Sequence, residues 1–209
     1  MKAVFVDGWG GTVVLLPGSH GSSSNSIGTE DGYVLEPQGE HRVTIITSDK
    51  SSKWCNVGMI TDTTQDCRDE LDSAAVRVAN ILSTEPENVI KGVGGVGQGA
   101  QVALNFAKWN AVGDHTMNMR LVIGINSWRI PTNRIDYAFG AAIRASWQSI
   151  LLIRGNLEPS IPLYFAKETA VSLIDDGFGE FRLLGPEITV SVLKKVEVWL
   201  NGKLPLDPN

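Results

Sequence analysis

A glycine-dense turn joins an apolar strand pattern to a helical pattern in residues 89–104, VIKGVGGVGQGAQVAL. A turn of this kind can serve two chemistries. Glycines before a helix N-terminus let backbone N–H groups approach a phosphate. A small-x-nucleophile-x-small turn instead holds a hydrolase nucleophile in a strained backbone conformation. The segment Gly95-Val96-Gly97-Gln98-Gly99 fits the second pattern, but Gly97 occupies the nucleophile position and has no side chain.

Phosphate binding fits the spacing less well. The sequence has no GxxxxGK[ST] segment, although Gly92, Gly94 and Gly97 do match GxGxxG. That fingerprint belongs to the first strand of a βαβ unit, whereas this strand is expected to be the fourth of the chain. A nucleotide-binding module is therefore the third hypothesis for this chain, and we expect no cofactor. A tight turn with no catalytic ancestry is a further alternative.

Metal and redox chemistry find little support in the sequence. The two cysteines, Cys55 and Cys67, match neither a zinc spacing nor a CxxC pattern. The histidines His20, His41 and His115 form no cluster with metal-ligand spacing. We therefore expect no metal site and assign a reducing, cytoplasmic compartment by default.

The composition is that of one globular domain, and we expect residues 1–209 to form it. Of the 209 residues, 43% are hydrophobic and 20% charged, which suits a single sizeable core. The net charge of -5 comes without a basic run, so nucleic acid is not an expected partner. Asp7 and a glycine turn interrupt the apolar N-terminus, so we expect neither a signal peptide nor a transmembrane segment.

Short runs rich in Val and Ile alternate with helical patterns along the chain. This order predicts an α/β fold with a mainly parallel sheet and helices on both faces, because parallel strands need crossovers. The first two runs are too close for a crossover and predict an antiparallel hairpin. The expected strands are Lys2–Val6, Thr12–Leu16, Val43–Thr47, Val89–Val93, Leu121–Asn126, Ser149–Ile153 and Phe181–Leu184, and the expected helices are Asp66–Leu82, Gln98–Trp109, Pro162–Ile174 and Ile188–Leu200.

Four motifs together resemble one family. The turn segment VIKGVGGVGQGAQVALNFA is similar to the GxSQGG/A elbow of the acyl-protein thioesterase, lysophospholipase and carboxylesterase group of α/β-hydrolases. In the same order, TVVLLPGSHG resembles that family's oxyanion loop, LVIGINSWRIP its Ser-x-Trp-x-Pro segment, and ILLIRGNLEPSIPLYFAKETAVSLIDDG its acid loop. The resemblance covers nearly the whole chain. It implies a phospholipase/carboxylesterase-type α/β-hydrolase fold.

The resemblance also implies where a catalytic triad would stand, and those positions are degenerate. Gly97 takes the place of the nucleophilic serine, Glu158 that of the aspartate, and Ile188 lies near that of the histidine. The family's oxyanion hole corresponds to backbone N–H groups of Ser19 and Gln98. Because these donors belong to the backbone, they can survive the loss of the side chains.

No histidine follows Glu158, although α/β-hydrolase triads run nucleophile, acid, histidine along the chain. Ser19 sits in a second elbow-like segment, PGSHG, but the SSSNSIG that follows cannot begin a packed helix. We therefore expect an inactive hydrolase that acts as a binding or scaffold module. It would be a subunit of a larger assembly with a protein partner, or a receptor for an acyl or small apolar ligand. The alternative is an active esterase or thioesterase with a rearranged site around Glu158 and His20.

Overall fold

A central sheet organises the molecule. The computed structural model describes residues 4–5, 12–16, 43–45, 68–88, 90–113, 117–125, 140–153, 163–178, 181–184 and 190–203. Within these residues, seven strands form one sheet in the order β1-β2-β4-β5-β6-β7, and β3 also pairs with β2. The strands are β1 (Val4–Phe5), β2 (Thr12–Leu16), β3 (Val43–Ile45), β4 (Lys91–Val96), β5 (Met119–Ile125), β6 (Ser149–Ile153) and β7 (Phe181–Leu184).

The sheet is mainly parallel, as the sequence predicts. Strands β2, β3, β4, β5, β6 and β7 pair in parallel, and β1 is antiparallel to β2. The turn expected between β1 and β2 lies outside the described residues, so the N-terminal hairpin stays a prediction. Parallel pairing sets all the carboxyl ends of these strands at one edge of the sheet, where loops of α/β folds carry their sites.

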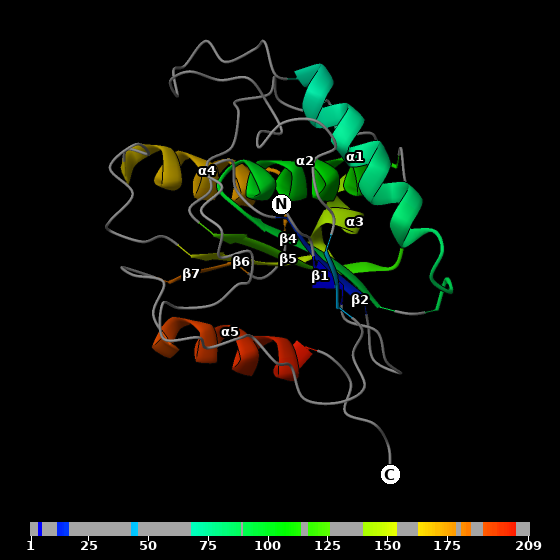
Figure 1. The fold of residues 1–209 in the computed structure, drawn as a ribbon. Coiled ribbons are helices and arrows are strands. Elements are labelled where there is room, and N and C mark those ends of the chain that lie inside the picture. Colours follow the sequence, from blue (N-terminus) through cyan, green and yellow to red (C-terminus); the bar gives the residue numbers. More distant parts are fainter. Residues whose placement is uncertain are drawn as a thin grey trace.

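Helices cover both faces of the sheet (Figure 1). In that view α1, α2 and α4 lie on one face and α5 on the other. The short helix α3 packs against α2 on the first of these faces. The helices are α1 (Arg68–Leu82), α2 (Gln98–Val112), α3 (Ala141–Ser146), α4 (Leu163–Asp175) and α5 (Val190–Lys203).

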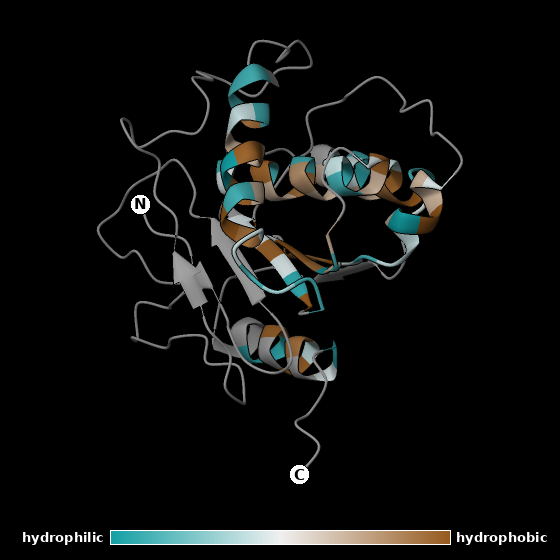
Figure 2. Cartoon of the chain, turned by 90° about the vertical axis from the view of Figure 1, so that its right-hand side faces the viewer, coloured by the Kyte–Doolittle hydropathy of each residue, from teal (hydrophilic) through white to brown (hydrophobic). Residues whose placement is uncertain are grey.

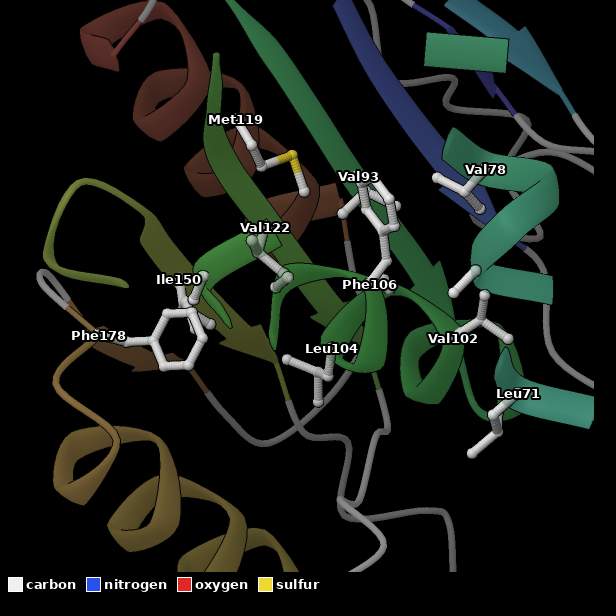
Figure 3. Close-up of a cluster of buried hydrophobic side chains, with 14 of the residues drawn as sticks. Leu71, Val78, Val93, Val102, Leu104, Phe106, Met119, Val122, Ile150 and Phe178 are labelled. Carbon is white, nitrogen blue, oxygen red and sulfur yellow. The ribbon is translucent and has the colours of Figure 1, made fainter. Parts of the chain in front are cut away.

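The strands bury both of their faces, which explains their continuous apolar sequences. Val122, Ile150 and Leu152 belong to the core cluster between the sheet and α2, whereas the residues that alternate with them, such as Ile123 and Leu151, are buried outside that cluster. Figure 3 shows the ring of Phe106 of α2 beside Val93 of β4, and the ring of Phe178 beside Ile150 of β6. The first contact packs α2 on the sheet, and the second packs the segment after α4 on it.

Helix α1 is amphipathic, and α2 is buried nearly all round. On α1 the apolar residues of one face are buried, namely Leu71, Ala74, Ala75, Val78 and Leu82. Teal and brown alternate along this helix in Figure 2. In α2, eleven of the fifteen residues are buried, which include the polar side chains Gln98, Gln101 and Asn110. A helix buried to this degree lies at the centre of a domain rather than on its surface.

Several boundaries differ from the sequence-based expectation, and one helix was not expected. β4 extends to Val96 and so reaches the glycine turn, and α2 continues to Val112. Helix α3 lies between β5 and β6, where the sequence pattern predicts no helix. Only six residues form it, and so short a segment offers no apolar period to detect. None of the helices described is long and apolar enough to cross a bilayer.

Candidate functional site

The glycine turn lies at the carboxyl edge of the sheet, between β4 and α2. β4 ends at Val96 and α2 begins at Gln98, so Gly97 alone makes the turn. Its N–H donates to the carbonyl of Ile125 at the end of β5, over 2.8 Å. Its carbonyl accepts the N–H of Ala100 at 3.1 Å and of Gln101 at 3.3 Å. The turn is therefore fastened both to the neighbouring strand and to the helix.

Gly97 adopts a backbone conformation that a side chain makes costly. Its φ is 57° and its ψ is -119°. L-residues rarely occupy this combination, and a residue held there by its surroundings stores about 1–3 kcal/mol of strain. In a nucleophile elbow that strain presents the nucleophile at the head of a helix. Here the backbone of an elbow is present and the nucleophilic side chain is absent.

Gln98 is the first residue of α2. The N–H groups of the first helical turn have no acceptor inside the helix, and the helix dipole adds positive potential at this end. This is the place where the expected oxyanion hole needs a backbone donor. Ser19, the expected second donor, lies outside the described residues, so the oxyanion hole stays a prediction.

Gln101 is a polar group of the elbow region that sequence reasoning missed. Its side chain is 3% exposed, and within the described residues neither its amide nitrogen nor its amide oxygen has a hydrogen-bond partner. Helical side chains tilt toward the N-terminus, so this residue, four positions after Gly97, shares the face of α2 that leads to the turn. A buried amide without partners costs about 1–3 kcal/mol. Position i+4 from Gly97 was the available signal, but glutamine in a helix usually suggests an exposed face.

The remaining predicted site residues lie outside the part of the chain that the structure describes. They are Ser19, His20, Glu158 and Ile188, together with all three histidines and both cysteines. Of the predicted triad positions, Gly97 alone therefore lies in the described residues. Among the described residues, no group of three His, Cys, Asp or Glu side chains could hold a metal ion. The expectation of no metal site stays a prediction.

Comparison with known proteins identifies the fold. No protein-family model and no curated protein matches the sequence. Among solved structures, acyl-protein thioesterase 2 of Zea mays superposes with a TM-score of 0.66 at 27% identity, over 72% of this chain and 71% of that one. Esterase PE8 gives a TM-score of 0.60 at 18% identity over 92% of each chain. A phospholipase/carboxylesterase from Dyadobacter fermentans gives 0.59 at 17% identity, over 97% and 95% of the two chains.

These similarities fall on one class of protein. The chain has an α/β-hydrolase fold, and the structures similar to it come from the acyl-protein thioesterase, esterase and phospholipase/carboxylesterase group of that superfamily. The resemblance stated from the sequence motifs is confirmed at this level. Because most of these sequence identities are below 20%, the similarities establish the fold and do not establish the activity.

Proposed function

We propose that this chain is a hydrolase-fold protein without triad hydrolysis that acts as a binding or scaffold module. The observation that carries the proposal is Gly97, which has the φ and ψ of a nucleophile elbow between β4 and α2 and no side chain to act as a nucleophile. The elbow is the one part of the expected triad that lies in the described residues.

The chemistry of acyl transfer supports the same conclusion. A serine hydrolase needs a nucleophile, and its general base activates that nucleophile. Here the nucleophile position is glycine, and the sequence has no histidine after Glu158. Loss of triad members in a serine hydrolase costs on the order of 10^6 in turnover, which leaves roughly 10^3–10^4 over water from the rest of the site. This remaining rate enhancement is too small for a useful esterase.

The proposal can be tested with two standard assays on the purified chain. We expect no covalent labelling by a fluorophosphonate probe and no hydrolysis of p-nitrophenyl esters above a heat-denatured sample. Gly97→Ser is the matched variant, because it restores a hydroxyl group at the elbow. We expect it to remain unlabelled and inactive, since a serine without a general base is a weak nucleophile.

Two results would contradict the proposal. One is labelling and turnover by Gly97→Ser, which would reveal a functional base near the elbow. The other is turnover by the unmodified chain that Glu158→Gln or His20→Ala abolishes, which would favour an active hydrolase with a rearranged site.

We also propose that residues 1–209 form one domain that joins a larger assembly in a reducing compartment. The single sheet with helices on both faces supports the domain assignment. Limited proteolysis checks it, because a single cooperative unit yields no stable half-length fragment.

A further inference from the structure

Helix α3 is fixed on the body of the molecule by three contacts. Arg144 Nε donates to the carbonyl of Ala111 near the end of α2 at 2.7 Å. Gln148 Nε2, which follows the helix, donates to the carbonyl of Ala107 at 3.1 Å and is fully buried. On the other side Gly177 comes so close that a Cβ atom placed on it would lie 3.5 Å from Ala142 Cβ. The position of α3 is therefore set by α2 and by the end of α4.

The outward side of this fixed helix is apolar. Ile143 is 48% exposed, and Trp147, the C-cap residue of α3, is 55% exposed. Residues four apart on a helix are neighbours on its surface, so these two side chains form one exposed apolar pair. Exposure of adjoining apolar side chains to water is unfavourable, and such patches mark interaction sites. Trp is also prominent among the residues that dominate the binding energy of interfaces.

Arg120 gives this apolar pair a fixed cationic neighbour. Leu121 of β5 pairs with Ser149 of β6, which sets Arg120 beside the residues that precede β6. Its guanidinium lies over the ring of Trp147, 5.4 Å from the centroid, and its Nε donates to Asn118 Oδ1 at 3.0 Å. Asn118 Nδ2 in turn donates to the carbonyl of Asn88 at 3.3 Å. The plane of the guanidinium is thus held from two sides.

The outer nitrogens of this guanidinium remain available. Within the described residues, Nη1 and Nη2 of Arg120 make no hydrogen bond, and neither Arg120 nor Arg144 forms an ion pair with a carboxylate. A planar guanidinium that is already oriented loses little entropy on binding and matches a carboxylate with two hydrogen bonds. The net charge of the chain is -5, whereas Arg120 and Arg144 place positive charge at this part of the surface. This local positive charge favours an acidic partner.

We propose that Ile143, Trp147 and Arg120 form a docking surface for a protein segment that presents a carboxylate beside an apolar side chain. The carboxylate pairs with the outer nitrogens of Arg120, and the apolar side chain covers Ile143 and Trp147. The proposal rests on the proposed binding role and assigns that role to this surface. The surface lies at the amino edge of the sheet, away from the elbow. An anionic membrane fits less well, because lipid-binding clusters hold about four to eight basic residues.

The test selects ligands from random short peptides displayed on phage, with the purified full chain as bait. We expect the enriched peptides to carry Asp or Glu near a large apolar residue. The strongest peptide is then synthesised and titrated. We expect Trp147→Ala and Arg120→Ala each to weaken its binding by about tenfold or more, and Arg120→Lys to weaken it as well, because lysine keeps the charge but loses the planar fork.

Tyr164→Ala is the control, since Tyr164 is an aromatic residue on α4 that is 49% exposed. It should leave peptide binding unchanged, and thermal unfolding should show that all variants are folded. The proposal is overturned if no peptide is enriched or if the enriched peptides lack acidic and apolar residues. It is also overturned if the Trp147 and Arg120 variants bind the peptide as tightly as the unmodified chain. Flotation with vesicles of equimolar phosphatidylcholine and phosphatidylserine that depends on Trp147 would overturn it in favour of a lipid surface.

This experiment is independent of the hydrolysis assays. A chain that hydrolyses esters and still binds the peptide through Trp147 would remove the proposed function and keep the surface. If the chain does not hydrolyse esters and Trp147→Ala leaves peptide binding unchanged, the proposed function stands and the docking surface is removed.

Discussion

The two ends of the β4–α2 unit differ in how well their polar groups are satisfied. At the elbow end, Gly97 caps α2 without a side-chain hydrogen bond and in a conformation that would be strained for any residue with a side chain. Within the described residues, the amide of Gln101 has no partner. At the other end, Gly113 closes α2 in the left-handed conformation and donates to the carbonyl of Trp109, while Arg144 and Gln148 reach two further carbonyls of the helix. One end stores unfavourable energy and the other stabilises the helix.

This difference is typical of a protein built around a site. Strain and unpaired polar groups concentrate at functional sites, and well-satisfied ends supply the stability that tolerates them. The backbone geometry of an elbow is thus present at Gly97 without a side chain. The contrast can be measured by substitutions at each end.

The largest effect is expected at the well-satisfied end. Arg144→Met removes a charged donor from the carbonyl of Ala111 and a positive charge from the C-terminus of α2. Charged hydrogen bonds contribute about 1.5–3 kcal/mol, and helix dipoles favour cations at this end. We expect the free energy of unfolding to fall by that amount in urea titrations. Lys167→Met, on the exposed side of α4, should change it by less than about 0.5 kcal/mol, and an equal loss in both variants would remove the contrast.

The backbone conformation of Gly97 predicts the next effect. Gly97→Ala adds a Cβ atom at φ 57° and ψ -119°, which should cost about 1–3 kcal/mol of unfolding free energy. Gly202→Ala is the matched control, because Gly202 lies in α5 with nothing within 4 Å of an added Cβ. It should be neutral or gain up to about 1 kcal/mol from helix propensity. Equal stability of the Gly97 variant and the unmodified chain would mean that this turn tolerates a side chain without strain.

Much of this framework could be predicted from the sequence. Apolar periods gave the order of the strands and the long helices, because burial of both sheet faces leaves a strong pattern. The pattern of small residues around Gly97 indicated an elbow, because only small residues fit so tight a turn. Glu158, Ile188, Ser19 and His20 stay predictions, since they lie outside the described residues.

Features that depend on tertiary neighbours could not be predicted. The stacking of Arg120 on Trp147 follows from the register of β5 against β6, which a sequence pattern does not reveal. Helix α3 owes its position to contacts with α2, not to an apolar period of its own. Burial of Gln101 reverses the usual preference of glutamine for the surface.

A pair of glutamines provides the third comparison. In the part of the chain that the structure describes, neither amide atom of Gln101 forms a hydrogen bond, whereas Gln148 donates from Nε2 and leaves its Oε1 unpaired. Replacement of an unsatisfied buried amide by an apolar side chain of similar size recovers its desolvation cost. We expect Gln101→Met to raise the unfolding free energy by about 1 kcal/mol and Gln148→Met to lower it by about 1 kcal/mol. Thermal unfolding of the two variants checks the signs, and a loss from Gln101→Met would show that this amide has a partner.

The smallest effect concerns Lys91, which begins β4 at the edge opposite the elbow. The side chain is 3% exposed and donates from Nζ to the carbonyl of Pro86 at 2.7 Å. Burial lowers the pKa of Lys91, and attraction from Glu85 and Glu87 opposes that shift. Between the lowered pKa and the ordinary lysine value, the unfolded chain binds a proton that the folded chain does not. Stability conferred by this group therefore rises with pH across that window.

Lys91→Met isolates this contribution from the other groups that titrate in alkali. We expect the unfolding free energy of the unmodified chain, measured relative to Lys91→Met in urea, to increase as the pH rises toward the ordinary lysine pKa. A relative stability that falls over the same range would mean that the carboxylates of Glu85 and Glu87 outweigh burial. In that case even this end of the β4–α2 unit would depend on surface charge rather than on satisfied buried groups.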